Sequence, residues 1–132
     1  MKDKLSVTLG ECQLIQKAWE EALDIDRTTE TRINRMREEV DELYELSGEG
    51  LNEKVKDPDY ARRMGEEIID IFIIGLSILD TMGLDAQQMF LAKMQRNYEK
   101  YDPVKARRYR EEGLTSEETL TRLKSEWNGK ML

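Results

Sequence analysis

The segment from Glu66 to Leu79, EEIIDIFIIGLSIL, constrains the fold of this chain more than any other feature of its sequence. As a helix it is apolar on nearly every face after Asp70, and a helix that is apolar all round is buried all round. In a chain of 132 residues, this pattern indicates burial in a helical bundle and also against a second subunit. Its apolar part, residues 68–79, is shorter than the roughly 20 residues needed to cross a bilayer, so we expect no membrane partner.

The rest of the chain also favours helices, because it holds only two prolines and long stretches lack any breaker. The predicted fold is an all-α helical bundle of four core helices, over residues 9–23, 29–46, 60–82 and 85–101. A further helical turn is expected over 105–110, and a short C-terminal helix after Thr115. Thr8 and Glu11 have the spacing of a capping box at the first helix. The predicted division is a domain over 1–112 and a helical arm over 113–132.

Helical spacing assigns the first helix an apolar face, formed by Cys12, Ile15, Trp19 and Ala22. Trp19 on this face is also a candidate to stack on an aromatic ligand, although such residues belong more often to the core.

Composition excludes several classes of function. The chain has 28 Asp and Glu against 21 Lys and Arg, a net charge of −7, which disfavours nucleic acid as a partner. It has no histidine, which removes Ser-His-Asp and Cys-His catalysis and the usual zinc sites. The single cysteine, Cys12, excludes an internal disulfide and, with no signal peptide visible, favours the cytoplasm. If the chain is an enzyme, we expect it to use carboxylates and a hard cation such as Mg²⁺ in catalysis.

Two pairs of acidic residues are predicted to point into the bundle. Glu39 falls within the apolar stripe of the second helix, and Glu42 follows one turn later at the edge of that stripe. Glu67 and Asp70 repeat the same three-residue spacing on the third helix, and residues three apart on a helix are neighbours. Four carboxylates from two helices are therefore expected to converge.

Buried carboxylates that also repel one another need compensation. Buried Arg or Lys partners, bound protons or a divalent cation would each provide it, and spacing alone leaves these alternatives open. Glu-rich helices are common in proteins without metals. Glu38, Asp41 and Glu45 point away from the stripe and are expected to face solvent.

The order of these motifs resembles the MazG-like nucleoside triphosphate pyrophosphohydrolases of the all-α superfamily. The pattern EExxEL at 38–43 is followed by EExxD at 66–70, by Gly83-Leu84-Asp85, and by a KxxxNxxKY segment at 93–101. The resemblance covers roughly residues 30 to 107. It departs from the family where Asp102 separates Tyr101 from Pro103.

The resemblance implies hydrolysis of a nucleoside triphosphate to the monophosphate and pyrophosphate, as a nucleotide-pool house-cleaning reaction. It implies Mg²⁺ as cofactor, with Mn²⁺ as an alternative, and a homodimer or homotetramer. The implied metal ligands are Glu39, Glu42, Glu67 and Asp70. The implied substrate contacts are Lys93, Asn97, Lys100, Tyr101 and Trp19.

A carboxylate near the attacking water can accept its proton, and Glu38 and Glu42 are the candidates for this catalytic base. Glu38 is the weaker candidate by its helical angle. Two alternatives to a broad-specificity hydrolase stay open: a dUTP- or dCTP-specific diphosphatase of the same superfamily, and a helical interaction protein without catalysis. A di-iron bundle is disfavoured because it requires histidines.

Overall fold

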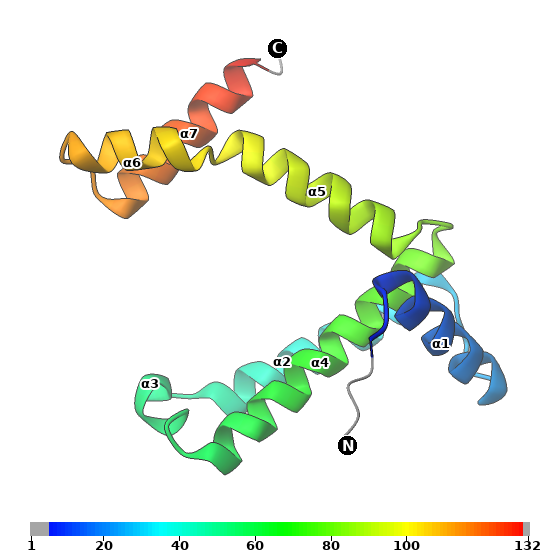
Figure 1. Cartoon of the computed structure of the whole chain (residues 1–132). Helices are drawn as coiled ribbons and strands as arrows, with labels where there is room; N and C mark the ends of the chain where they lie inside the picture. Colours follow the sequence, from blue (N-terminus) through cyan, green and yellow to red (C-terminus); the bar gives the residue numbers. More distant parts are fainter. Residues whose placement is uncertain (1–5, 131–132) are drawn as a thin grey trace. The chain divides into compact units, whose positions relative to one another are not determined.

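The computed structural model describes residues 6–130, with side chains to residue 128. Within that range the chain is all-helical and contains no strand, which confirms the prediction that it is all-α (Figure 1). Its helices are α1 (Leu9–Ala22), α2 (Thr29–Ser47), α3 (Leu51–Lys54), α4 (Pro58–Thr81), α5 (Ala86–Lys100), α6 (Pro103–Glu111) and α7 (Ser116–Lys130). The chain divides into two compact units, one ending at Gln87 and one starting at Gln88. Residues 1–5 of the predicted first domain lie outside the described range.

The helix ends follow the local sequence signals. Thr8 and Glu11 form the predicted capping box at α1, since each side chain bonds the other residue's backbone N–H. Asp57 caps α4 by accepting a hydrogen bond from the Asp59 backbone, and Pro58 occupies the first helical turn. Gly83 follows the end of α4 with φ of 74°, a conformation that glycine adopts without strain.

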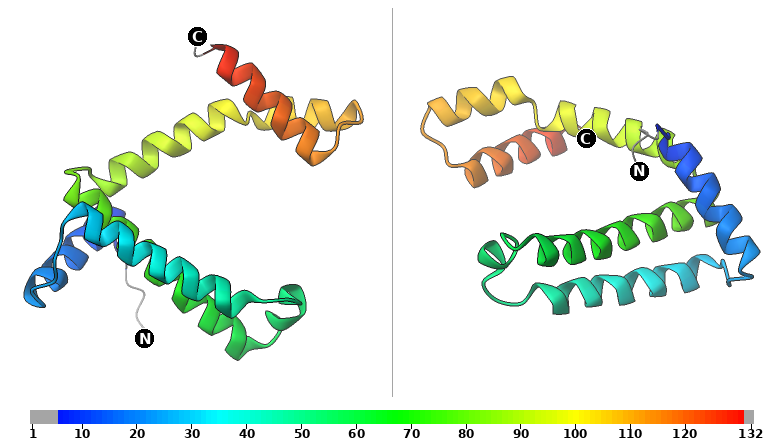
Figure 2. Two further views of the ribbon diagram at one scale, coloured as in Figure 1. Left: turned by 180° about the vertical axis from the view of Figure 1, so that it is seen from behind. Right: turned by 60° about the horizontal axis from the view of Figure 1, so that its bottom comes forward.

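In the first unit, α2 packs lengthwise against α4, and α1 also contacts α4 (Figure 2). The middle of α4 forms the core, where Ile74, Leu76 and Ile78 are buried. Ile69 and Phe72 on the same helix are 54% and 45% exposed, so this unit buries only part of the α4 surface. Among the described residues, no helix has the length and apolarity that a bilayer span requires.

Most of the predicted apolar face of α1 is exposed to solvent in this unit. Ile15 and Trp19 are exposed, whereas Gln13 and Glu20 are the residues of α1 that become buried. The physical reason is that the neighbouring backbone offers polar partners. The Gln13 amide donates to the carbonyls of Leu76 and Leu84, at 3.3 and 2.9 Å, and its oxygen accepts from the Ala86 backbone at 3.0 Å.

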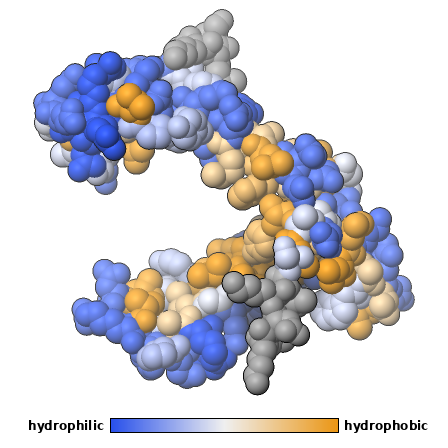
Figure 3. All heavy atoms as spheres, viewed as in Figure 1, coloured by the Kyte–Doolittle hydropathy of each residue, from blue (hydrophilic) through white to orange (hydrophobic). Residues whose placement is uncertain are grey.

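The second unit contains a hairpin of α6 and α7 around Tyr109 and Leu123, which are both buried. The Tyr109 hydroxyl donates to Glu126 at 2.7 Å, and the Arg122 guanidinium lies 4.0 Å from the centre of its ring. The prediction of a short last helix is wrong, because α7 has 15 residues. On the face shown in Figure 3 this hairpin is mostly hydrophilic.

Candidate metal centre and adjoining pocket

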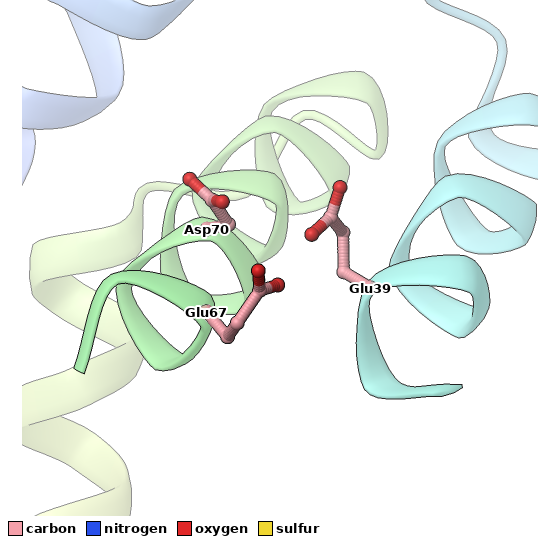
Figure 4. Close-up of side chains that lie close together, drawn as sticks. All are labelled: Glu39, Glu67 and Asp70. Carbon is pink, nitrogen blue, oxygen red and sulfur yellow. The ribbon is translucent and has the colours of Figure 1, made fainter. Parts of the chain in front are cut away.

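Three carboxylates from two helices converge in the first unit. Glu39 projects from α2 toward Glu67 and Asp70 on α4, and one oxygen of each lies within 4.8 Å of the others (Figure 4). Helical spacing places Glu67 and Asp70 one turn apart on the same face, and the packing of α2 along α4 brings Glu39 to them. The predicted convergence of the two acidic motifs is confirmed for these three residues, but the expectation that all of them point into the bundle is wrong for Asp70, which is exposed.

The cluster is only partly compensated by protein groups. The Glu39 side chain is 4% exposed, and its Oε1 lies 2.6 Å from an Arg35 nitrogen. The other oxygen, Oε2, is buried and has no partner among the described residues, and the same holds for Oε2 of Glu67. Two unsatisfied buried oxygens in one acidic cluster are costly unless another group joins them.

The acidic surroundings shift the protonation of Glu39. Burial raises its pKa above the ordinary value for a glutamate, and the negative charges of Glu42 and Asp70 raise it further, while Arg35 opposes the rise. A cation between the carboxylates would favour the ionised form of Glu39 and give the unpartnered oxygens a ligand. Carboxylate oxygens are the donors that Mg²⁺ and Mn²⁺ accept, so this donor set fits a hard divalent ion.

A pocket of about 410 Å³ adjoins the cluster. Glu39 and Asp70 form part of its wall, and the remaining wall residues come from all three long helices of the unit and the α1–α2 loop. They are Gln16, Trp19, Glu20, Ile25, Arg32, Arg35, Ile73 and Ile74. Trp19 is 57% exposed, so one face of its ring is open to a ligand. The volume falls in the range of small-molecule sites.

One wall of this pocket is a buried charge network that sequence analysis missed. The Glu20 side chain is 1% exposed and accepts hydrogen bonds from Ser77 at 2.7 Å and from Arg27 at 2.9 Å. It also accepts from Gln16 at 3.1 Å and pairs with Arg32 at 3.4 Å. Burial acts to raise the pKa of Glu20, but these partners together outweigh it and hold the pKa below its ordinary value. An acid followed by an arginine seven residues later is too common a pattern to have revealed this network.

Glu42 and Glu38 take different places from the three clustered acids. Glu42 is exposed and, with Glu67, lines a second depression beside the cluster. Its charge still reaches Glu39, whose pKa it raises. Glu38 is exposed and bonded to Arg35 at 2.9 Å, as expected for a residue that points away from the apolar stripe. The catalytic role of either residue stays a prediction.

The remaining substrate residues predicted from the sequence belong to the second unit. Lys93 is exposed and Asn97 half-buried on α5, where they lie about one helical turn apart. Lys100 ends α5, with its ammonium 5.2 Å from the ring centre of Tyr101. Their contact with a substrate stays a prediction.

Comparisons with models of known protein families, with curated proteins and with solved structures found no match.

Proposed function

We propose that the chain is a Mg²⁺-dependent nucleoside triphosphate pyrophosphohydrolase of the MazG-like type, releasing the monophosphate and pyrophosphate. One observation carries this proposal: Glu39, Glu67 and Asp70 converge within 4.8 Å, and two of them hold buried oxygens that no other described residue partners. The adjoining pocket adds a place for the rest of the substrate. Together they bring a cation site and a small-molecule site to the same pair of helices.

The proposed roles of the residues in the first unit follow from where they lie. Glu39, Glu67 and Asp70 hold Mg²⁺, which when bound neutralises phosphate charge and lowers the pKa of water. Glu42 accepts the proton of the attacking water, because it lies beside the cluster and, unlike Glu38, makes no ion pair with Arg35 among the described residues. Trp19 stacks on the base, since its exposed ring lines the pocket. The resemblance of the 93–101 segment, and not its position, is the reason that Lys93, Asn97, Lys100 and Tyr101 are proposed as further contacts to the phosphates and sugar.

The proposal includes a homodimer or homotetramer. Ile33, Met36, Phe72 and Leu79 belong to an apolar groove of about 520 Å³ along α2 and α4. A second copy of the chain is the occupant that we propose, because two identical apolar faces can pair about a two-fold axis. Exposed apolar surface of this kind is uncommon on monomers.

A substrate screen tests the reaction directly. The purified chain is incubated with canonical and modified nucleoside triphosphates, dUTP and dCTP among them, with diphosphates, and with Mg²⁺, Mn²⁺ or EDTA. Monophosphate and pyrophosphate are scored together. We expect metal-dependent pyrophosphate release, with the substrate ranking separating a broad enzyme from a dUTP- or dCTP-specific one.

Variants connect that activity to the carboxylates. Glu39→Gln, Glu67→Gln and Asp70→Asn should each lower kcat/KM by about a hundredfold or more, because each removes a charged ligand of the ion. Glu66→Gln is the matched control, since Glu66 precedes Glu67 and instead pairs with Arg62 at 2.6 Å. Full activity in all three ligand variants would reject the assigned site. The absence of turnover with every substrate would favour a helical interaction protein without catalysis.

A further inference from the structure

Arg32 lines the pocket, yet its hydrogen-bonding capacity is largely unused. Its side chain is 11% exposed, and one terminal nitrogen makes a long contact of 3.4 Å with Glu20. Its Nε is buried and has no acceptor among the described residues. A guanidinium carries five N–H donors and no acceptor, so burial with donors unpaired is unfavourable. A ligand oxygen that entered the pocket and reached the guanidinium would supply the acceptor that it lacks.

The position of Arg32 relative to the acidic cluster indicates which part of a ligand would carry that oxygen. Arg32 precedes Glu39 by seven residues (39 − 32) on α2, about two helical turns and roughly 10 Å along the axis. On α4, Ser77 is likewise seven residues (77 − 70) beyond Asp70, and both Ser77 and Arg32 contact Glu20. The pocket therefore has the acidic cluster at one end and the Arg32–Glu20 pair two turns away.

We infer that this second end of the pocket binds the nucleobase and that Arg32 selects bases bearing a ring carbonyl oxygen. The inference rests on the proposed function, which places the phosphates beside Glu39 and Asp70. Trp19 and Ile25 supply apolar wall for the ring, and Arg32 supplies only donors. A carbonyl oxygen is the complementary acceptor. An amino group in the same place would set donor against donor and leave both unpaired.

The test uses inosine 5′-monophosphate and adenosine 5′-monophosphate, which differ in a carbonyl or an amino group at one ring position. Their Kd values for the full chain are measured by calorimetry with Mg²⁺ present. Wild-type protein should bind the inosine nucleotide about tenfold more tightly or better, since a charged donor left unpaired by the wrong base carries at least that penalty.

Arg32→Lys isolates the guanidinium. Its single ammonium can keep the ion pair with Glu20, so the buried acid retains a partner, but it lacks the planar fork of donors. The ratio of the two Kd values should fall to near one in this variant. Arg37→Lys, an exposed exchange of the same chemistry on α2, is the matched control and should keep the wild-type ratio. Thermal unfolding of each variant verifies that it is folded.

The possible outcomes separate this inference from the proposed reaction. A ratio near one in wild-type protein, a ratio unchanged in Arg32→Lys, or no binding of either nucleotide would overturn the selection by Arg32, even if triphosphates are hydrolysed. A clear ratio that depends on Arg32, found in a chain that hydrolyses no triphosphate, would support the base site and reject the hydrolase.

Discussion

Two buried glutamates in the first unit have opposite electrostatic surroundings. Glu20 accepts four hydrogen bonds or ion pairs, and its pKa is lowered despite burial. Glu39 pairs with Arg35 alone, faces two further carboxylates, and has a raised pKa. Glu20, whose partners the fold supplies, stabilises the structure. Glu39, which lacks such partners, is the better candidate to bind a ligand.

The lowered pKa of Glu20 predicts a pH-dependent loss of stability in Glu20→Gln. Because the folded pKa lies below the ordinary value of 4.5, ionised Glu20 stabilises the fold above pH 4.5, and this contribution disappears as the pH falls through the folded pKa. The variant should be destabilised by about 3 kcal/mol near pH 7, since it leaves the buried Arg32 without its charged partner and Arg27 with Asp80 alone. The difference should shrink below pH 4.5 in urea unfolding curves. Glu21→Gln, an exposed neighbour, should show little effect at any pH.

Metal binding at the acidic cluster should be visible in stability as well as in activity. Mg²⁺ that binds only the folded chain raises Tm, by an amount that grows with the logarithm of its concentration above Kd. Glu39→Gln and Asp70→Asn should abolish this rise while leaving the metal-free Tm equal or higher, because each removes charge repulsion from the cluster. Scanning calorimetry with MgCl₂ or EDTA provides the measurement. An equal rise in wild type and both variants would place the ion elsewhere.

At the scale of helices, local signals predicted most of the fold and part of the site. The three-residue spacing within each acidic motif placed Glu67 beside Asp70 and aimed Glu39 inward, because helical period alone determines which side chains share a face. The buried side of α1 was not predictable in this way. Gln13 and Glu20 are buried only because backbone carbonyls and Ser77 of another helix receive them, and a single helix's sequence does not contain those partners.

Two glycines, one within α4 and one just after its end, test how much the helical structure depends on local preference. Gly65 lies within the helix, and nothing would lie within 4 Å of an added Cβ, so Gly65→Ala should stabilise the chain by about 1 kcal/mol. Gly83→Ala should have the opposite sign, a loss of about 1 kcal/mol, because φ of 74° is unfavourable for any residue with a Cβ. Thermal unfolding of both variants measures the contrast. Equal shifts in the same direction would contradict the helix boundary at α4.

At the scale of the whole molecule, the first unit leaves much of the apolar surface of α4 exposed, although the sequence of this helix predicts burial on nearly every face. The segment that is apolar on nearly every face keeps Ile68, Ile69 and Phe72 about half exposed, and Ile33 on α2 is 50% exposed beside them. Water-exposed side chains of this type gain free energy when another surface covers them, at roughly 25 cal/mol for each Å² of apolar area. The proposed second copy of the chain supplies such a surface.

Phe72→Glu tests whether a second copy covers that surface. A charge placed in the apolar groove should dissociate a homo-oligomer, because an unpaired carboxylate is costly to bury between two subunits. Wild-type chain should therefore sediment as a dimer or tetramer in analytical ultracentrifugation, and the variant as a monomer with its helical circular dichroism retained. Val104→Glu, at an exposed valine in the second unit, controls for added charge and should keep the wild-type mass. A wild-type chain that sediments as a monomer, with a mass that does not change in Phe72→Glu, would reject the homo-oligomer proposal.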